Sequence, residues 1–287
     1  MNNLQESGAD APVSTGLPEL DYILSGGYAR NRIHLIEGQP GAGKTTLALQ
    51  FLLDGRARGE CTLYVTLSES QDELTNAAAS HGWDLSGIHI YELVPPELSL
   101  DPDREQSIVY ASDLELGETV KMVLAEVERV RPARIVFDSL SEIRLLSQGA
   151  LRYRRQVLAL KHFFAKHSCT VLFLDDLTQD ANDLNLHSLA HGVVRLEQLA
   201  PAYGAERRRL RVYKMRARAF RGGFHDFVIR TGGVQVFPRL VATSHPDPDQ
   251  RLPAAARSGI DELDAITGGG LDYGTTTLVV GPAGSGK

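Results

Sequence analysis

A glycine-rich segment, GQPGAGKT at residues 38–45, limits the folds open to this chain more than any other feature. It matches the pattern G-x-x-x-x-G-K-[ST] at every fixed position. A short apolar segment precedes it, and a segment with the apolar periodicity of a helix follows it. Glycines let the backbone amides turn toward an anion, and the start of a helix adds the positive end of its dipole. The motif therefore predicts a phosphate-binding loop between a strand and a helix.

The side chains of this loop suit a nucleoside triphosphate bound with a divalent cation. Lys44 supplies a point charge for the β- and γ-phosphates, and the Thr45 hydroxyl is a ligand for Mg²⁺. We therefore expect ATP and Mg²⁺ as the bound species. The predicted nucleotide-binding residues of the loop are Gly38, Gly41, Ala42, Gly43, Lys44, Thr45 and Thr46.

A second metal ligand is expected at the end of a neighbouring strand. Asp138 ends the apolar segment 134–139, where a carboxylate would face the cleft beside the loop. An aspartate at a strand end is also a common turn or cap residue. Because the phosphate loop is present, we predict Asp138 as a metal ligand together with Thr45.

Hydrolysis also requires a group that orients or deprotonates water. Glu69 follows the strand-like segment 62–67 and is the predicted residue for this role. Asp175 and Asp176 end another strand-like segment and are the rival acids. They could instead be helix caps or groups that sense the γ-phosphate.

Segments typical of strands and helices alternate over the first 190 residues. Apolar segments that indicate buried parallel strands occupy 32–38, 62–67, 88–93, 134–139 and 170–176. Helix-like segments occupy 44–59, 70–82, 117–131 and 151–167. Later strand-like segments are separated by glycine pairs and indicate antiparallel strands. The sequence predicts an α/β fold with a mostly parallel central sheet, flanking helices and an antiparallel C-terminal extension, and residues 94–113 are predicted as a surface loop.

Residues 15–44 and 258–287 repeat each other without a gap, at an offset of 243 residues. Twelve of the 30 aligned positions are identical, and they mix Glu, Leu, Asp, Gly and Lys. We therefore predict a first domain at 1–243, a linker at 244–257 rich in Pro, Asp and Ala, and the truncated start of a second domain at 258–287. The chain reaches Lys287 before the hydroxyl residue and the helix that should follow the second loop. We expect either a longer natural gene product or a truncated form.

A basic segment, RRRLRVYKMRARAFR at 207–221, carries eight cationic side chains. Because side chains alternate along a strand, one side is predicted to be apolar first and then cationic, with Leu210, Val212, Lys214, Arg216 and Arg218. Such a cationic strand end suits the stabilisation of a phosphoryl group in transfer. A solvated sheet edge with scattered arginines, and a nucleic-acid stripe lining the pore of a ring, are the alternatives.

Several motifs together resemble the KaiC family of RecA-superfamily ATPases. They are TGLPELD with Gly26-Gly27, YVTLSE at 64–69, SHGWDL at 80–85 and KMR at 214–216. The resemblance implies a RecA-like P-loop NTPase domain in two tandem copies, and hexamers with ATP between subunits. It implies that Ser80 lies near the base or ribose, and that Lys214, Met215 and Arg216 reach the ATP of the neighbouring subunit. The family's N-terminal domain commonly carries two adjacent glutamates where this chain has Ser68-Glu69.

These features predict a Mg²⁺-dependent, slowly hydrolysing ATPase with Lys44, Glu69 and Arg216 as catalytic residues. It would act as an oligomeric switch of signalling or clock-like type, with signalling proteins as partners. The serine/threonine autokinase activity of KaiC relatives would belong to the second domain of a full-length protein. The alternatives are a DNA recombination or repair ATPase of RecA/RadA type, and a non-hydrolysing scaffold with ATP as a structural ligand, which the serine at position 68 makes conceivable.

Composition and charge limit the partners and the cellular compartment expected for such a protein. The net charge of −6 disfavours a dedicated nucleic-acid binder. No apolar run approaches the roughly 20 residues of a membrane-spanning helix. The polar start MNNLQESGAD differs from a signal peptide. Cys61 and Cys169 each open an apolar segment, as buried thiols in a reducing cytosol do. We expect a cytoplasmic protein without membrane association.

Overall fold

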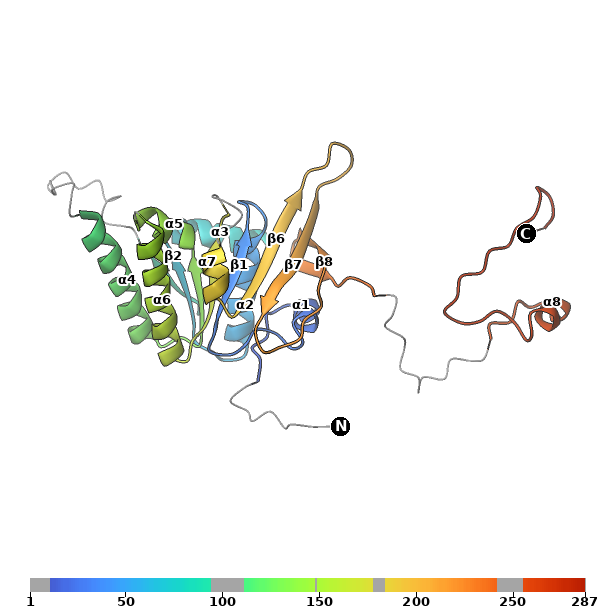
Figure 1. The fold of residues 1–287 in the computed structure, drawn as a ribbon, viewed down its shortest axis with the longest axis horizontal. Coiled ribbons are helices and arrows are strands. Elements are labelled where there is room, and N and C mark those ends of the chain that lie inside the picture. Colours follow the sequence, from blue (N-terminus) through green and yellow to red (C-terminus); the bar gives the residue numbers. More distant parts are fainter. Residues whose placement is uncertain (1–10, 94–110, 148, 178–183, 242–254, 287) are drawn as a thin grey trace. The chain divides into compact units, whose positions relative to one another are not determined.

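The strand-like segments pair into one nine-stranded sheet within the residues that the computed structural model describes, namely 11–93, 111–147, 149–177, 184–241 and 255–286. The strand order is β3-β2-β4-β5-β1-β6-β7-β8-β9. The strands are β1 (Ile33–Gly38), β2 (Thr62–Thr66), β3 (His89–Glu92), β4 (Arg134–Asp138), β5 (Thr170–Asp175), β6 (Gly192–Leu199), β7 (Arg207–Met215), β8 (Phe224–Arg230) and β9 (Gly233–Phe237) (Figure 1).

Strand direction divides the sheet into two parts. All pairings among β1 to β6 are parallel, whereas β6, β7, β8 and β9 pair antiparallel. The first six strands therefore end at one edge of the sheet, the carboxyl edge, and begin at the opposite edge, the amino edge. Because β7 runs in the reverse direction, it begins at the carboxyl edge and ends at the amino edge.

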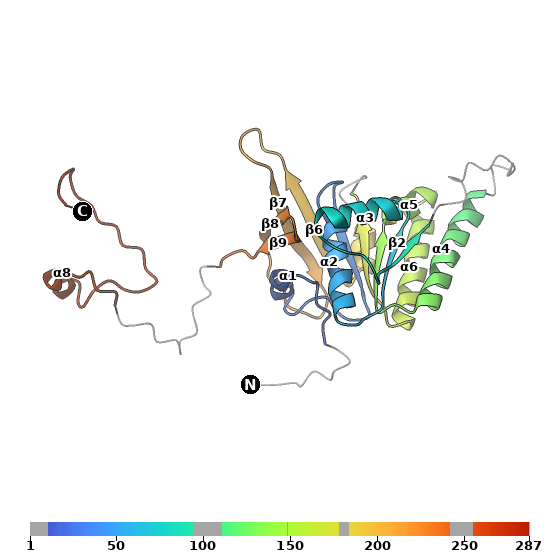
Figure 2. The same cartoon turned by 180° about the vertical axis from the view of Figure 1, so that it is seen from behind.

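Helices cover both faces of the sheet and bury two hydrophobic clusters. One face carries α1 (Pro18–Ile23), α2 (Lys44–Ala57) and α3 (Gln71–Ser80), which pack on the cluster that includes Ile36 (Figure 2). The other face carries α4 (Ala111–Val130), α5 (Leu140–Leu146), α6 (Ala150–Lys166) and α7 (Leu184–Leu189), which pack on the cluster that includes Leu35. Neighbouring residues of β1 thus point to opposite faces, and both faces are buried.

Local sequence explains how individual elements begin and how they are tied together. Ser70 and Glu73 form a capping box that starts α3 directly after β2. The buried Arg134 side chain donates to the carbonyl oxygens of Phe51, at 2.7 Å, and Ser14, at 3.1 Å. It also forms ion pairs with Asp54 and Glu60. One guanidinium therefore joins the start of β4 to the C-terminal part of α2 and to the N-terminal segment.

This architecture confirms the predicted α/β fold with a mostly parallel sheet and an antiparallel C-terminal extension. The predicted surface loop at 94–113 is mostly outside the described residues, but 111–113 belong to α4, which starts six residues before the expected helix. The short helices α1, α5 and α7 were absent from the sequence prediction. Helices of only six or seven residues are too short to show a clear apolar period.

The prediction for the basic strand is wrong at its cationic end. The pairing of β7 with β6 shifts by one residue, so that Val212 lies opposite Val194 whereas Lys214 lies opposite Val193. Val193 and Val194 belong to different hydrophobic clusters, so Lys214 and Val212 lie on opposite faces of the sheet. A β-bulge produces this reversal because it adds one residue to one strand of a pair.

Two of the predicted strand residues also lie beyond the strand. β7 ends at Met215, so Arg216 and Arg218 are not on it. Ala217, between them, has a φ of 56°, which is not an extended conformation. The shared side predicted for Leu210, Val212, Lys214, Arg216 and Arg218 is therefore not formed.

The chain divides into two compact units, Met1–Arg239 and Leu240–Lys287. The smaller unit contains α8 (Asp261–Ile266) and an isolated bridge between Ala256 and Leu271. Its hydrogen bond from the Ser258 amide to Asp264, at 2.8 Å, repeats the 2.7 Å bond from the Thr15 amide to Asp21 in the larger unit. The two repeats therefore share local structure as well as sequence. No helix in the described part of the chain is long and apolar enough to cross a membrane.

Candidate nucleotide-binding site

The glycine-rich segment forms the turn between the carboxyl end of β1 and the start of α2. Gly43 is the residue before the helix, and its φ of 99° is in the left-handed region that favours glycine. No side chain caps the amide groups at the start of α2. These amides point out of a 14-residue helix and can bind an oxyanion. The backbone of the loop thus fits a phosphate group.

Lys44 lies buried against this loop. Its Nζ donates to the carbonyl oxygens of Gly38, at 2.8 Å, and Gln39, at 3.1 Å. It also forms an ion pair of 2.8 Å with Asp176 Oδ1, at the end of β5. The ammonium group is therefore held at the carboxyl edge by the loop and by one of the two aspartates that the sequence left open.

Tyr64 brings the two predicted metal ligands together. Its hydroxyl donates to Asp138 Oδ2 at 2.6 Å, and the Thr45 side chain hydrogen-bonds the same hydroxyl. Burial raises the pKa of Asp138, and the hydrogen bond from Tyr64 opposes this rise. No group of three or more His, Cys, Asp or Glu side chains suited to a metal occurs among the described residues. A hydroxyl and one carboxylate fit Mg²⁺, which keeps several waters and binds phosphate oxygens.

Glu69 belongs to the same cluster of charges. Its pKa is raised by burial first and then by the negative charges of Asp138 and other acids nearby, while Lys44 lowers it. Thr66 fixes the turn after β2, because its hydroxyl donates to the Glu69 carbonyl at 2.7 Å and accepts from the Glu69 amide at 3.0 Å. Ser68, at the position of the missing glutamate, is exposed. The predicted water-activating residue thus interacts electrostatically with the loop lysine.

The two rival aspartates have different surroundings. Asp176 contacts Lys44, whereas Asp175 accepts a hydrogen bond from Ser141, at 3.0 Å, and forms an ion pair of 3.3 Å with Arg144. Ser141 and Arg144 belong to α5, on the face opposite α2. Asp175 therefore lies away from the phosphate loop, and Asp176 is the aspartate beside it.

Ser80, the last residue of α3, lies at the carboxyl edge. Its hydroxyl donates to the Ala77 carbonyl at 2.7 Å. The next residue, His81, accepts from the Gly232 amide at 3.0 Å and hydrogen-bonds the Arg230 carbonyl through its ring. This contact joins the end of α3 to the turn between β8 and β9. A role for Ser80 at the base or ribose stays a prediction.

Lys214, Met215 and Arg216 lie at the amino edge, away from the phosphate loop of the same chain. Lys214 donates to the carbonyl oxygens of His187 and, at 2.9 Å, Ala190. Arg216 donates to the Ser188 carbonyl at 2.7 Å, and Met215 is buried opposite Gly192. Val193 lies opposite both Lys214 and Leu35, so Lys214 is three residues, or roughly 10 Å, along the strand direction from Gly38. Arg216 lies farther along, where its amide donates to the His191 carbonyl at 3.0 Å.

Tyr64 and Asp176 are the site residues whose positions sequence reasoning did not settle. A tyrosine within an apolar strand is expected in a hydrophobic core, and its hydroxyl gave no separate signal. Strand register could have indicated the contact between Tyr64 and Asp138. Thr66 lies opposite Asp138, so Tyr64 is a diagonal neighbour of that carboxylate. The register itself depends on the strand order β2-β4, which the sequence alone does not specify.

The chain is similar to known proteins over most of its length. The family model described as "ATPase: KaiC" matches residues 13–241. A UPF0273 protein of Pyrococcus horikoshii is 29% identical over 239 residues, which cover 80% of this chain and 95% of the relative. The circadian clock oscillator protein KaiC of a Picosynechococcus strain is 28% identical over 286 residues, which cover 96% of this chain. The chain spans 53% of that KaiC protein. The match to the family model covers most of the chain, and the chain therefore belongs to the KaiC ATPase family.

Proposed function

We propose that this chain is a Mg²⁺-dependent ATPase whose nucleotide site is completed by a second copy of the chain. The observation that carries the proposal is the placement of two groups of residues. Lys44, Thr45 and Asp138 lie at the carboxyl edge, whereas Lys214 and Arg216 lie toward the amino edge, on and after a strand two places from β1 in the sheet. One chain cannot bring both groups to one phosphate, but two neighbouring chains can.

The residues at the carboxyl edge have distinct roles in this proposal. The amides of the loop and Lys44 bind the phosphates, and Thr45 and Asp138 hold the Mg²⁺ ion, which neutralises charge on the phosphate oxygens. Tyr64 orients the Asp138 carboxylate through its hydrogen bond of 2.6 Å. Glu69 orients or deprotonates the attacking water, supported by its raised pKa and its proximity to Lys44.

The cations at the amino edge act on the neighbour's nucleotide. Arg216 has five N–H donors and uses one for the Ser188 carbonyl in the described contacts, so others remain for phosphate oxygens. An arginine supplied by a second subunit can raise the rate about 10³-fold or more. A contact between two different surfaces closes into a ring when its rotation permits, and we propose such a ring, a hexamer as in the KaiC resemblance, for this chain.

Assembly would then depend on nucleotide state, as in a slow oligomeric switch of signalling or clock-like type with protein partners. The interface gains charge-assisted hydrogen bonds only when phosphate is present. We assign this function to a first domain at residues 1–243. A linker at 244–257 and the start of a second KaiC-like domain at 258–287 follow, and any autokinase activity belongs to that second domain. The proposed nucleotide site lies wholly within residues 38–216.

Light scattering of the full chain tests this proposal. Adding Mg²⁺ and a non-hydrolysable ATP analogue should convert the chain into a larger assembly of defined mass. Lys44→Ala should neither bind the analogue nor assemble. Arg216→Ala should bind it and fail to assemble, while Lys121→Met, an exposed cation on α4, should behave like the wild type. A wild-type chain that is saturated with the analogue and stays monomeric would contradict the proposal.

A further inference from the structure

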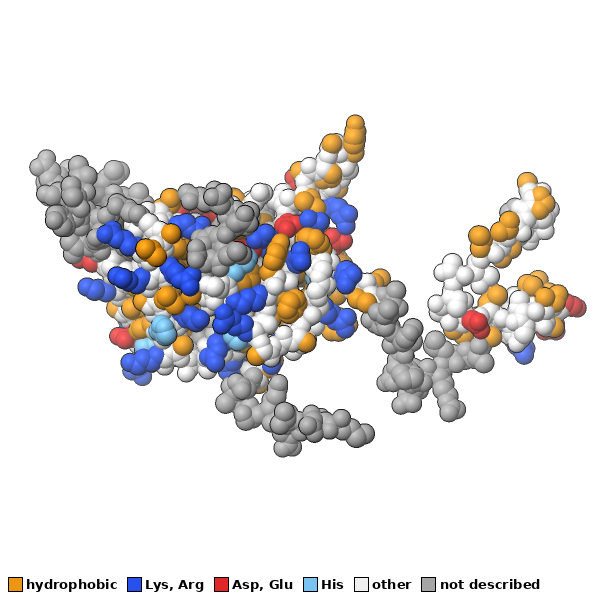
Figure 3. All heavy atoms as spheres, viewed as in Figure 1, with side chains coloured by type: hydrophobic (Ala, Val, Ile, Leu, Met, Phe, Trp, Pro, Cys, Tyr) orange, Lys and Arg blue, Asp and Glu red, His pale blue; other side chains and the backbone are white. Residues whose placement is uncertain are grey.

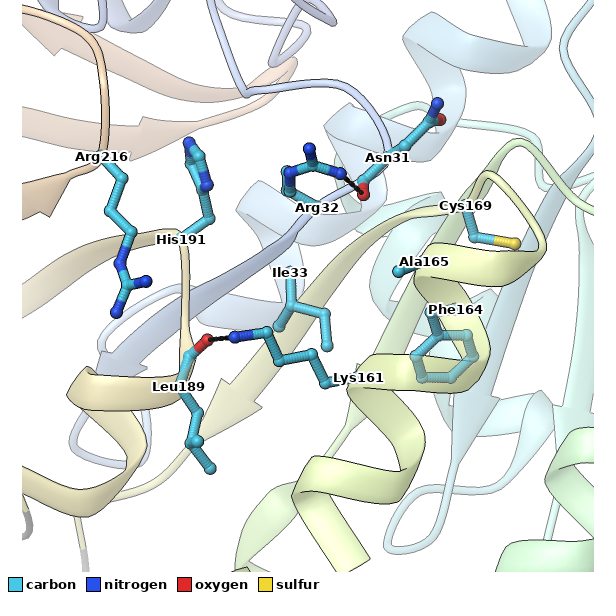
Figure 4. A pocket seen from close by; sticks show the side chains of 10 residues that line it. All are labelled: Asn31, Arg32, Ile33, Lys161, Phe164, Ala165, Cys169, Leu189, His191 and Arg216. Atoms are coloured by element: carbon cyan, nitrogen blue, oxygen red, sulfur yellow. Dashed lines mark hydrogen bonds between the residues drawn. The ribbon is translucent and has the colours of Figure 1, made fainter.

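A pocket of about 150 Å³ opens at the amino edge of the sheet, on the face covered by α6 and α7 (Figure 4). Its walls come from the start of β1 and the residues before it, from α6 and the turn after it, from the end of α7 and the residues that follow, and from the turn after β7. Binding sites for drug-sized ligands usually have about 300–1,000 Å³. The pocket therefore suits a small ligand of a few non-hydrogen atoms.

Three cationic side chains line a pocket whose other walls are largely apolar. Arg32, Lys161 and Arg216 line it together with His191, and no Asp or Glu is among the lining residues. Figure 3 shows Lys and Arg side chains gathered on this face of the molecule, over α6 and α7. This concentration is notable in a chain with a net charge of −6.

The cations repel one another in their present arrangement. Burial lowers the pKa of Lys161, and the charges of Arg216 and Arg32 lower it further. The pKa of His191 is lowered by burial first and then by nearby cations, among them Arg32 and Arg216. No carboxylate ion pair offsets this repulsion for Arg32, Lys161 or Arg216 among the described contacts. A bound anion would offset it.

Backbone contacts hold the cations in place and leave donors for a ligand. Lys161 donates to the Leu189 carbonyl at 2.9 Å, Arg216 to the Ser188 carbonyl at 2.7 Å, and Arg32 to the Asn31 carbonyl at 3.1 Å. The ammonium group has three donors and each guanidinium has five, so most of them remain. The three cations thus keep donors that a ligand in the pocket can use.

We propose that this pocket binds a phosphate-type oxyanion between Arg32, Lys161 and Arg216. Guanidinium groups match the geometry of phosphate oxygens in pairs, and the lysine adds a mobile point charge. The same chemistry is present in free orthophosphate and in the phosphates of a nucleotide held by a second copy of the chain. Arg216 also belongs to the proposed contact with the neighbour's nucleotide, but the pocket itself needs neither ATP nor assembly.

Orthophosphate titrations of the Lys44→Ala chain, followed by the ³¹P line width, test the proposal. This background lacks the loop lysine, so binding there does not depend on the proposed ATP site. We expect a Kd of about 1 mM or tighter. Lys161→Met in the same background should weaken binding about tenfold or more, whereas Lys161→Arg should retain it. Lys166→Met, an exposed cation on the same helix, should change nothing.

A second titration distinguishes the two sources of phosphate. If nucleotide phosphates of a neighbour fill the pocket, a non-hydrolysable ATP analogue should displace orthophosphate from the assembled wild-type chain. If free phosphate is the ligand, both should bind together, and either outcome agrees with the proposal. Phosphate binding that is absent in the Lys44→Ala chain, or that is equally strong in its Lys161→Met and Lys166→Met derivatives, would overturn it.

Discussion

Two consecutive aspartates at the end of β5 lie on opposite sides of the sheet, and this position decides what each can do. Asp176 is 2.8 Å from the Lys44 ammonium, beside the phosphate loop. Asp175 interacts with Ser141 and Arg144 on the other face. We therefore propose Glu69 or Asp176, rather than Asp175, for a role in hydrolysis.

Glu69 is the residue that we expect to activate water. Glu69→Gln should retain ATP binding, because the loop and Lys44 are untouched, and should reduce turnover by roughly 10²- to 10⁴-fold, the usual effect of removing a general base. Turnover under saturating ATP measures this effect. Asp175→Asn is the control and should leave the chemical step nearly unchanged. The assignment fails if Asp175→Asn abolishes turnover while Glu69→Gln does not.

Asp175 should instead affect how stability depends on pH. Burial raises its pKa in the folded chain, although Arg144 and Ser141 oppose the rise. A raised pKa means that the folded state binds the proton more tightly, so the contribution of Asp175 to stability falls as pH rises above about 4. Asp175→Asn should remove this slope.

Urea unfolding of the wild type and Asp175→Asn at several pH values between about 4 and 7 measures the effect. The difference in unfolding free energy, wild type minus variant, should be larger at the acidic end and should decrease as pH rises. A difference that is constant across this range, or that increases with pH, would show that the pKa of Asp175 is not raised.

Single residues also show what the sequence could predict about the site. Lys44, Thr45, Asp138 and Glu69 follow from a motif or a strand end, and the structure brings them to one edge of the sheet. Their roles remain predictions. Tyr64 could not be predicted, because its contact with Asp138 depends on which strands are neighbours, and that is a property of the tertiary structure.

At the scale of secondary-structure elements, the segment before α1 packs so closely on α2 that it leaves no room for a side chain at Gly16. Gly16, in the segment before α1, has a φ of +82°, and a Cβ there would lie 2.5 Å from the Gln50 carbonyl oxygen of α2. Gly59, after α2, has a φ of +77°, and nothing lies within 4 Å of its Cβ position. The two glycines differ in how closely their neighbours pack, but a residue with a Cβ would have similar backbone strain at either position.

This pair gives a prediction for stability. Gly59→Ala should cost about 1–2 kcal/mol, the strain of a left-handed residue with a Cβ. Gly16→Ala should cost a further 1–3 kcal/mol or so, because the N-terminal segment or α2 must shift. Equilibrium unfolding of both variants measures the difference. Equal losses of stability would mean that the contact with α2 is unimportant.

The strands and long helices follow closely from the sequence, but the cationic end of β7 does not. Buried strands are marked by apolar runs, and α3 by its capping box. The bulge opposite Val193 and Val194 has no sequence signal of its own, because the residues before and after it in β7 are both rich in Arg and Lys. A shift of one residue moved Lys214 to the other face, which periodicity cannot reveal.

At the scale of the whole molecule, the sheet presents a nucleotide-binding edge and a cationic edge. The parallel strands place the phosphate loop, Asp138 and Glu69 at the carboxyl edge, while the reversal at β7 returns the chain to the amino edge. We propose that a chain built in this way binds nucleotide alone and needs a neighbour to complete the site.

Mixing two inactive variants tests this claim most directly. Lys44→Ala lacks a working loop and Arg216→Ala lacks the cation for the neighbour, so each should be inactive alone. In equal mixtures, the interface between the intact loop of Arg216→Ala and the intact Arg216 of Lys44→Ala is the one that can form, because neither variant assembles with itself, so at most about half of the loops become active. ATP turnover should therefore recover to about that fraction of the wild-type rate. Full activity of Arg216→Ala alone, or no recovery although mixed assemblies form, would contradict a site shared between chains.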